Sequence, residues 1–575
     1  MILQALCSYY GRLFQEGQVV AQGFQEKEIP FVLVLDAEGR FIDIEDTRTG
    51  EGKARRARRF VVPREIKRSG KNAWQSANLL WDNEGYVIGW SSADPGKARR
   101  QREAFRSTLQ ERLGDVKDEG ARAVRRFLER DDVSAITNHP LWAEVAEKGA
   151  NLTFRLRGDT NLVCERPAVR DRIVASAVEA VEGRRQACLI TGETDVPVRL
   201  HAAIKGVRGA NTTGANIVSF NLPAFASHGK EQSYNAPVGR AAEFAYTTAV
   251  NTLLGRDSKH RLSVGDATAV FWAERRHEIE DVFADFFGEQ PGDAPSQDLR
   301  QVVALYRSPY SGVKPELDPH TRFFVLGLAP NAARLAVRFW HAGTVGEVAV
   351  NIGAHFDDIE IAAPPKWPSV LPLRTLLKGL AVQGDLENVP PNLAGDFVKA
   401  VLAGTRYPIT LLSAALRRVR AERDVTYPRA AVIKAVLARE ARIHSHSAKE
   451  VGMSLDPQNT NAGYRLGRLF AALEKVQEEA SPGINATIRD RFYGAASATP
   501  VAAFPHLMKL KNHHLAKLEN RGRAVNLERL IGEIMDGVEE FPAHLSLQDQ
   551  GRFAVGYYHQ RQDFFRKRDT LTSNL

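Results

Sequence analysis

A proline-rich segment at residues 362–372 divides this 575-residue chain into two parts with different apolar patterns. Each of its four prolines lacks an amide N–H and has a fixed φ angle, so the segment suits neither a helix interior nor a central strand. Before it, apolar residues recur with both strand and helix periods, whereas after it almost every apolar stripe has the helical period. The sequence therefore predicts an α+β fold, with N-terminal mixed antiparallel-sheet and helical domains followed by a C-terminal helical bundle.

Local patterns subdivide the N-terminal part. Residues 31–35 and 41–44 flank the turn 36–39 and predict a β-hairpin, and residues 78–81 and 86–88 predict a second one. Further strands are expected at 152–156, 217–220, 269–272, 323–326 and 335–339, and helices at 1–17, 97–129 with a break near Gly114, 168–181 and 241–254. We expect three domains: 1–132 with hairpins, helices and a basic arm, 133–361 with mixed α/β structure, and 374–575 with the bundle.

The composition limits the cellular setting and the kinds of site. The formal net charge of +9 weakly favours a polyanionic partner. The cysteines, Cys7, Cys164 and Cys188, form no CxxC pair, so neither a disulfide scaffold nor a cysteine-rich zinc site is supported. The sequence has no signal-peptide pattern and no apolar run of about 18 residues. We therefore expect a cytoplasmic protein that does not enter a membrane.

Most of the net charge lies between the two predicted hairpins. Residues 51–71 contain nine basic and two acidic side chains, a net charge of +7. The basic arm that we consider comprises Arg55, Arg56, Arg58 and Arg59, and the polar segment after the run contains Lys71, Asn72, Trp74, Gln75 and Asn78. Arginines hold DNA phosphates, whereas Asn, Gln and Lys side chains read base edges in the grooves. The alternative is a solvated charged face, which is the usual outcome for a charge run. A second basic block follows at residues 97–106.

A glycine-rich loop at residues 204–221 is the other candidate binding feature. Three glycines at positions 206, 209 and 214 alternate with cations and small polar residues, among them Lys205, Arg208, Asn211 and Thr212. Glycine permits unusual backbone angles and close approach of a ligand, and amides, hydroxyls and cations together can hold phosphate oxygens. The loop matches neither the Walker pattern nor the dinucleotide fingerprint. A glycine-rich crossover inside a core is an equally good interpretation from the residues alone.

The sequence provides little support for a catalyst. His355, Asp357 and Asp358 are a rival set of metal ligands for a nucleic-acid-processing enzyme, but the further partners of such a nuclease are missing. No nucleophile elbow, P-loop or His-Glu-x-x-His motif occurs. We therefore expect no catalytic residue, no resident metal and no cofactor.

Several long segments resemble a known family. They are MILQAL at 1–6, CLITGE at 188–193, the glycine-rich loop, NAPV at 235–238, FAYTTAVNTLL at 244–254, LGLAPNAARLAVRFW at 326–340, GYRLGRLFAALEKVQ at 463–477, NATIRDRFYGAASATP at 485–500 and QGRFAVGYYHQRQ at 550–562. Together they extend over essentially the whole chain. They resemble the large subunit of the type I-C (Dvulg subtype) CRISPR surveillance complex, Cascade.

The resemblance implies a non-catalytic, antiviral DNA-surveillance function. Such a subunit binds at the 5′ end of a guide RNA, beside the backbone-forming and small subunits. It recognises the protospacer-adjacent motif in target duplex DNA, aids R-loop formation and recruits a separate helicase-nuclease. Guide pairing then supplies most of the sequence specificity, and protein reads only the short motif. On this interpretation residues 71–78 read the motif, the basic arm holds phosphates and the glycine-rich loop contacts a nucleic-acid backbone.

The same resemblance implies a second product of the gene. Type I-C systems make their small subunit from an internal start within the large-subunit gene. The chain has four methionines, and Met453 is placed just before the amphipathic pattern that begins near Gly463. We expect residues 453–575 to form this free helical subunit, with Arg465, Arg468 and Lys475 contacting the displaced strand. A nearby non-Met start codon is the alternative.

Overall fold

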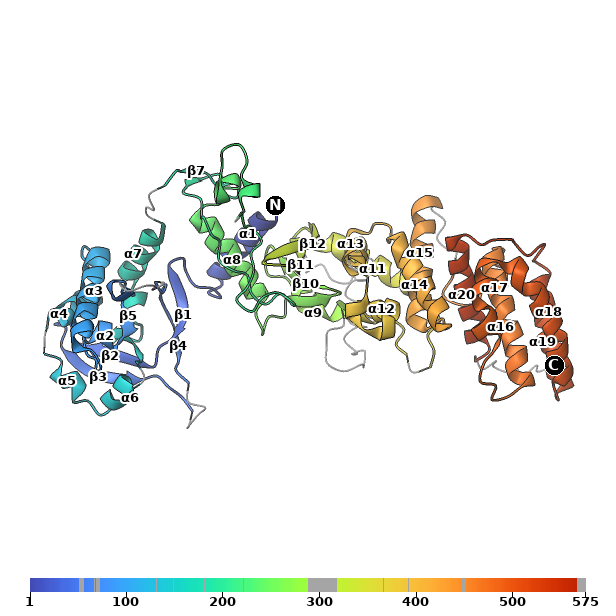
Figure 1. The fold of residues 1–575 in the computed structure, drawn as a ribbon, viewed down its shortest axis with the longest axis horizontal. Coiled ribbons are helices and arrows are strands. Elements are labelled where there is room, and N and C mark those ends of the chain that lie inside the picture. The colour runs from blue at the N-terminus through green and yellow to red at the C-terminus, as the bar shows by residue number, and fades with distance from the viewer. Residues whose placement is uncertain are drawn as a thin grey trace. The chain divides into compact units, whose positions relative to one another are not determined.

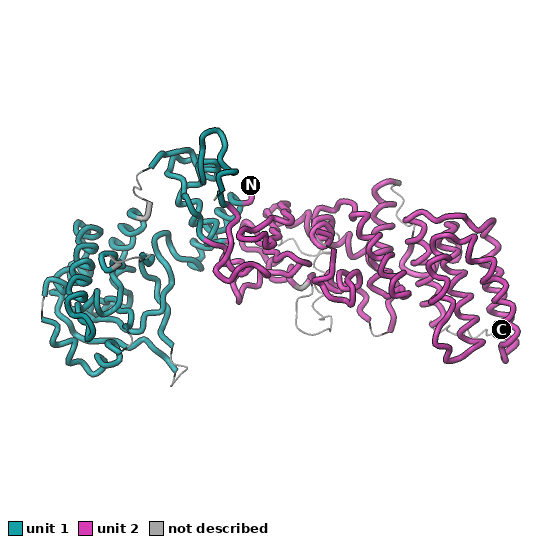
Figure 2. Tube along the Cα trace, viewed as in Figure 1, with its two compact units in different colours: residues 1, 3–202, 219–249 teal, residues 2, 203–218, 250–575 magenta. Residues whose placement is uncertain are grey.

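The computed structural model describes residues 1–565 except 51–55, 67, 69–72, 131, 148, 179–182, 221, 288–317, 366, 391 and 446–450. The chain has two compact units (Figure 2). Unit 1 comprises residues 1, 3–202 and 219–249, and unit 2 comprises residues 2, 203–218 and 250–575. Small sheets with helices occur in the N-terminal half and helices dominate the C-terminal half, so the predicted α+β class is confirmed (Figure 1).

Unit 1 is built around a mixed four-stranded sheet of order β3-β2-β6-β5. The strands are β2 (Phe31–Leu35), β3 (Phe41–Asp46), β5 (Trp81–Asn83) and β6 (Asn151–Leu156). β2 and β3 form the predicted antiparallel hairpin, and β2 pairs with β6 in parallel. Phe105 of α3 (Pro95–Leu113) and Phe127 of α4 (Glu119–Glu129) pack on Phe154 of β6, at ring-centroid distances of 6.2 and 5.8 Å. These helices therefore bury one face of the sheet.

The second predicted hairpin is wrong. Residues 81–83 form β5, but the following residues form the short helix α2 (Glu84–Val87). The Asn83 side chain accepts a hydrogen bond from the Gly85 amide at 3.1 Å and caps this helix. β5 pairs with β6 from far along the chain, and Tyr86, Val87 and Ile88 are all buried.

The remaining elements of unit 1 lie around this sheet and in a loop-rich C-terminal part. A two-stranded antiparallel ladder joins β1 (Phe24–Glu28) to β4 (Arg59–Pro63). The other elements are α1 (Ile2–Gln15), α5 (Ser134–Thr137), α6 (Trp142–Glu147), α7 (Pro167–Val178), β7 (Gln186–Ala187), β8 (Thr194–Asp195) and α8 (Arg240–Leu253), whose last turn belongs to unit 2.

Unit 2 begins with an antiparallel sheet of order β12-β11-β10-β9. Its strands are β9 (Arg261–Val264), β10 (Ala267–Ala273), β11 (Arg322–Asn331) and β12 (Arg334–Thr344). The strands predicted at 269–272, 323–326 and 335–339 are confirmed, and β11 and β12 pair as an antiparallel hairpin. Phe283 of α9 (Ile279–Phe287) packs between Phe271 and Phe323, at 4.7 and 4.9 Å. The strand predicted at 217–220 is absent, because the chain there makes only isolated bridges at Ala215 and Asn216.

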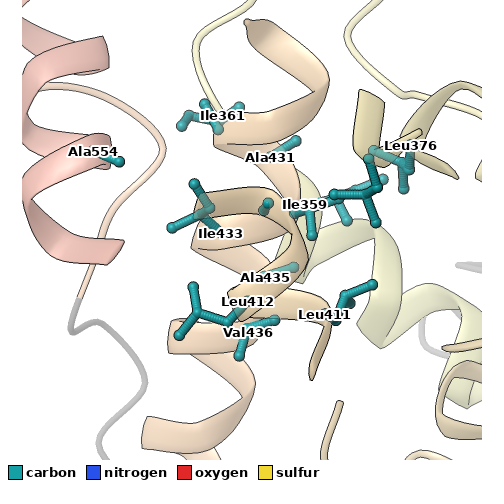
Figure 3. Close-up of a cluster of buried hydrophobic side chains, with 14 of the residues drawn as sticks. Ile359, Ile361, Leu376, Leu411, Leu412, Ala431, Ile433, Ala435, Val436 and Ala554 are labelled. Carbon is teal, nitrogen blue, oxygen red and sulfur yellow. The ribbon is translucent and has the colours of Figure 1, made fainter. Parts of the chain in front are cut away.

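The C-terminal half of unit 2 is helical. The helices are α11 (Val345–Ile359), α12 (Leu373–Leu380), α13 (Leu393–Ala403), α14 (Ile409–Glu422), α15 (Tyr427–Ser445), α16 (Ala462–Ala480), α17 (Ile488–Ala498), α18 (Pro500–Lys517), α19 (Arg521–Met535) and α20 (Leu547–Asp563). Figure 3 shows Ile433 and Val436 of α15 beside Leu411 and Leu412 of α14, with Ala554 of α20 nearby. One hydrophobic core extends from the β-sheet to α20 and includes residues at both ends of the proline-rich segment. The three-domain division stays a prediction.

Helices α16 and α20 pack unusually closely. A Cβ atom at Gly467 of α16 would lie 2.0 Å from the Phe553 carbonyl oxygen of α20. A Cβ atom at Gly556 of α20 would lie 2.2 Å from the Tyr464 carbonyl oxygen of α16. These two glycines therefore permit a backbone contact that no other residue would allow.

Candidate nucleic-acid interface

The basic arm emerges from the β1–β4 ladder. Arg59 pairs with Glu28 at the end of the ladder, and Arg56 forms an antiparallel bridge with Thr49. Arg56, Arg58 and Arg59 are all exposed. The Arg59 guanidinium lies 3.7 Å from Glu28 with its side chain 69 % exposed, and the Arg58 guanidinium lies 5.0 Å from the Phe60 ring centroid. These contacts leave their charges open to solvent, whereas Arg55 lies outside the described residues.

Asn78 was predicted to read a base edge, and the structure gives it another role. Its side chain is only 2 % exposed, and its amide oxygen accepts a hydrogen bond from the Ile66 N–H at 2.9 Å. Its own N–H donates to the Asp82 carboxylate at 2.9 Å, and Arg68 forms an ion pair with the same carboxylate. Burial raises the pKa of Asp82, although Arg68 and the amides act in the opposite direction. Asn78 therefore holds the loop in place through these bonds, and base reading by Asn78 stays a prediction.

Trp74 and Gln75 lie on a short 3₁₀ helix, η2 (Ala73–Gln75). The Arg100 guanidinium of α3 lies 5.5 Å from the Trp74 ring centroid, which is within cation–π range. Gln75 is exposed, whereas Trp74 is half-buried. The structure thus brings part of the predicted reading segment against the second basic block, whose members Lys97, Arg99 and Arg100 are exposed. Lys71 and Asn72 lie outside the described residues.

Residues 204–218 of the glycine-rich loop belong to unit 2, and a short bridge closes this part of the loop. Ile204 and Ala215 exchange backbone hydrogen bonds of 2.8 and 2.9 Å. Gly206 and Gly214 have φ angles of +87° and +95°, and a Cβ atom at either would lie within 2.7 Å of a carbonyl oxygen of the protein. Gly214 is therefore required where the loop closes against Ile204, and Gly206 where the loop passes the Leu254 carbonyl after α8.

The four predicted contact side chains of this loop face solvent, whereas Ile204, Val207 and Ala215 are buried. Lys205, Arg208, Asn211 and Thr212 are all exposed. The backbone beneath two of them is anchored: the Lys205 N–H donates to the Asn251 side chain at 2.8 Å, and the Arg208 N–H donates to Thr268 Oγ1 at 2.9 Å. Arg208 also forms an ion pair with Glu387, 179 residues further on, which nothing in the local sequence pattern indicated.

Of the rival metal ligands, His355 and Asp358 take part in a buried network, whereas Asp357 is exposed and its backbone carbonyl accepts a hydrogen bond from Lys434 at 2.8 Å. His355 Nδ1 and the Tyr407 hydroxyl are 2.7 Å apart, and Asp358 accepts hydrogen bonds from Arg439 at 2.5 Å and Arg442 at 3.0 Å. Burial, and secondarily the charge of Arg439, lower the pKa of His355 to about 3. Among the described residues no cluster of three or more His, Cys, Asp or Glu side chains has the arrangement of a metal site. His355 and Asp358 are therefore bonded to Tyr407, Arg439 and Arg442.

The cations predicted to face DNA from the C-terminal bundle are also engaged internally. Arg468 is 5 % exposed and donates to Gln560 of α20 and the Pro457 carbonyl, both at 3.2 Å. Arg465 donates to the Asn459 carbonyl at 2.8 Å, and Lys475 forms an ion pair with Glu479 at 3.2 Å. Other cations of this bundle are exposed, among them Lys509 and Lys517 of α18 and Arg521 and Arg529 of α19.

Residues 6–565 match the model of a family described as CRISPR-associated protein (Cas_Csd1). No curated protein matches the chain. In the part of the chain that the structure describes, no helix has both the length and the apolar character needed to cross a bilayer.

Proposed function

Because the chain belongs to the Csd1 family of CRISPR-associated proteins and is a type I-C Cascade large subunit, we propose that it recognises the protospacer-adjacent motif in duplex DNA. In this proposal the protein is not a catalyst. It aids R-loop formation and recruits a separate helicase-nuclease that cuts the DNA. Base pairing with the guide RNA supplies the remaining specificity.

The exposed arginines beside the β1–β4 ladder carry this proposal. Arg56, Arg58 and Arg59 are exposed to solvent. Arg58 lies over the Phe60 ring, and Arg59 lies 3.7 Å from Glu28 and 4.0 Å from Glu26, two side chains that are themselves exposed, so these contacts compete only weakly with a phosphate. Charged side chains of this kind neutralise DNA phosphates and fix the position of a protein on the duplex. We assign base reading to Asn72 and Gln75, with Lys71 and Trp74 beside them, and backbone contact in unit 2 to Lys205, Arg208, Asn211 and Thr212.

Motif discrimination tests the base-reading assignment. Replacing Asn72 and Gln75 by Ala in the assembled complex should reduce the preference for the correct motif by about 1–3 kcal/mol for each good base contact. Guide RNA binding and assembly should be unchanged. Affinity is measured on duplexes that carry the correct or an altered motif, and Gln458→Ala, at an exposed glutamine of unit 2, is the matched control. An equal loss of affinity on both duplexes would assign these residues to the backbone instead.

We also propose that residues 453–575 are made separately as a small helical subunit. Met453 lies in the loop before α16 and is 51 % exposed. The helices α16 to α20 all follow it, and α16 packs closely on α20. Exposed α18 lysines such as Lys509 and Lys517 replace Arg465, Arg468 and Lys475 as the cations that we assign to the displaced strand.

A further inference from the structure

The ion pair between Arg208 and Glu387 joins the glycine-rich loop to a distant short turn of unit 2. Glu387 lies on the 3₁₀ turn η7 (Leu386–Asn388). The Arg208 and Glu387 side chains are 41 % and 69 % exposed. Water competes for both charges in such an exposed pair, so the pair is weak and another anion can replace the carboxylate.

The backbone on each side of the Arg208–Glu387 ion pair is fixed by hydrogen bonds, so the fold itself brings these two side chains together. The Arg208 N–H is fixed on Thr268 of β10, and the bridge between Ile204 and Ala215 closes the loop. On the other side, the Asp385 carboxylate accepts the Glu387 N–H at 3.0 Å. The Asn388 side chain donates to the Val382 carbonyl at 3.2 Å, which closes the same turn.

The chemistry around Arg208 suits a phosphodiester better than a carboxylate. Lys205, Asn211 and Thr212 add a cation, an amide and a hydroxyl on the same exposed loop. A guanidinium binds phosphate in the same forked geometry that it uses for a carboxylate. Glu387 therefore occupies the position that a phosphate oxygen would take.

We propose that Glu387 is a built-in competitor of the nucleic-acid backbone. In the free chain its carboxylate holds the Arg208 guanidinium, and a phosphate of a bound strand displaces it. This proposal depends on the proposed function in one respect: it assumes that the partner of this loop is a nucleic acid. The competition would favour some strands over others. A strand that binds only at this loop would lose affinity, whereas a strand that other parts of the protein also hold would still displace Glu387.

A double-mutant cycle on the full chain tests the competition. We expect Glu387→Gln to tighten binding of labelled single-stranded DNA or RNA about 2- to 5-fold, since it removes the competing charge. Arg208→Ala should weaken binding and reduce the slope of log K against log salt by about 0.7 for a single strand. In the Arg208→Ala background, Glu387→Gln should have no effect. A larger gain on RNA than on DNA of the same sequence assigns the loop to the guide, and the reverse assigns it to the target.

Glu533→Gln is the matched control, because Glu533 is 64 % exposed and lies 3.9 Å from Arg529 in the same unit. The proposal is overturned if this control gives the same gain as Glu387→Gln, or if the gain persists without Arg208. It is equally overturned if Glu387→Gln leaves affinity unchanged in a variant that melts like wild type. Motif discrimination, measured in the same variants, reports separately on the proposed function, since Glu387 does not enter it.

Discussion

At the scale of single residues, side-chain exposure, rather than residue type, separates the predicted contact residues that can reach a nucleic acid from those that are bonded inside the protein. Asn78 and Arg468 are polar and were assigned to DNA, yet both are buried and bonded within the protein. Their partners Ile66 and Gln560 could not be identified from periodicity, because hydrogen-bond partners across a fold leave no local pattern. Arg56, Arg58 and Arg59 were predicted from charge density alone and are exposed, since burying several neighbouring like charges without partners is very costly.

The arm arginines make a prediction about salt. Replacing Arg56, Arg58 and Arg59 by Ala should weaken binding to all duplexes alike, because phosphate contacts carry no sequence information. Each lost contact should reduce the slope of log K against log salt by about 0.9. The measurement is a salt titration of the assembled complex, with Arg40→Ala, another exposed arginine of unit 1, as the control. An unchanged slope would mean that the arm is only a solvated face.

His355 makes a prediction about acid stability. Its pKa of about 3 lies below the ordinary value of 6.5, so between these pH values the unfolded state binds more protons than the folded state. Stability should therefore fall as the pH is lowered from 6.5, by up to about 1.4 kcal/mol per pH unit from this group. Denaturant unfolding of wild type and His355→Phe at pH 7 and pH 5 measures the difference. The variant should lose less stability than wild type on acidification, and equal losses would contradict the assignment.

At the scale of elements, apolar runs on both sides of a clear turn predicted a hairpin correctly. The helix-capping role of an asparagine was not recognised from the sequence. The β2–β3 hairpin was predicted because residues 36–39 are strong turn formers between two apolar runs. Residues 78–88 have a similar pattern, but Asn83 caps a helix there and β5 pairs with distant β6. The glycine-rich loop was picked out by its composition, whereas its contact with Glu387 depends on tertiary structure.

The α16–α20 contact predicts opposite effects for two glycine substitutions. Gly467→Ala places a methyl group against the Phe553 carbonyl, so it should destabilise unit 2 by about 1–3 kcal/mol despite the better helix propensity of alanine. At Gly494 of α17 a Cβ atom meets nothing within 4 Å, so Gly494→Ala should stabilise by up to about 1 kcal/mol. Chemical denaturation of the two variants measures both. If Gly467→Ala were as stable as Gly494→Ala, the close approach of the two helices would be refuted.

At the scale of the whole molecule, the proposed internal start predicts a second polypeptide in the purified complex. Expression of the wild-type gene should yield a product whose mass corresponds to residues 453–575, and Met453→Ala should remove it. Intact-mass spectrometry distinguishes these outcomes, and Met508→Ala is the control because Met508 follows the proposed start. A small product that persists in Met453→Ala would place the start elsewhere, and its absence from wild type would refute the proposal.

Helix α20 has a second contact surface besides the one that meets α16. A Cβ atom at Gly551 would lie 3.2 Å from both Ile433 and Leu412, and the Tyr558 hydroxyl donates to the Ala362 carbonyl at 2.7 Å. Ile433, Leu412 and Ala362 all precede Met453. A polypeptide that begins at Met453 therefore keeps the contact between α16 and α20 but lacks the residues that cover the other side of α20. We expect such a polypeptide, made alone, to associate with itself through the bared apolar strip, which size-exclusion chromatography would detect. In the cell the amount of this polypeptide would then be limited by the number of partner surfaces that can cover the apolar side of α20.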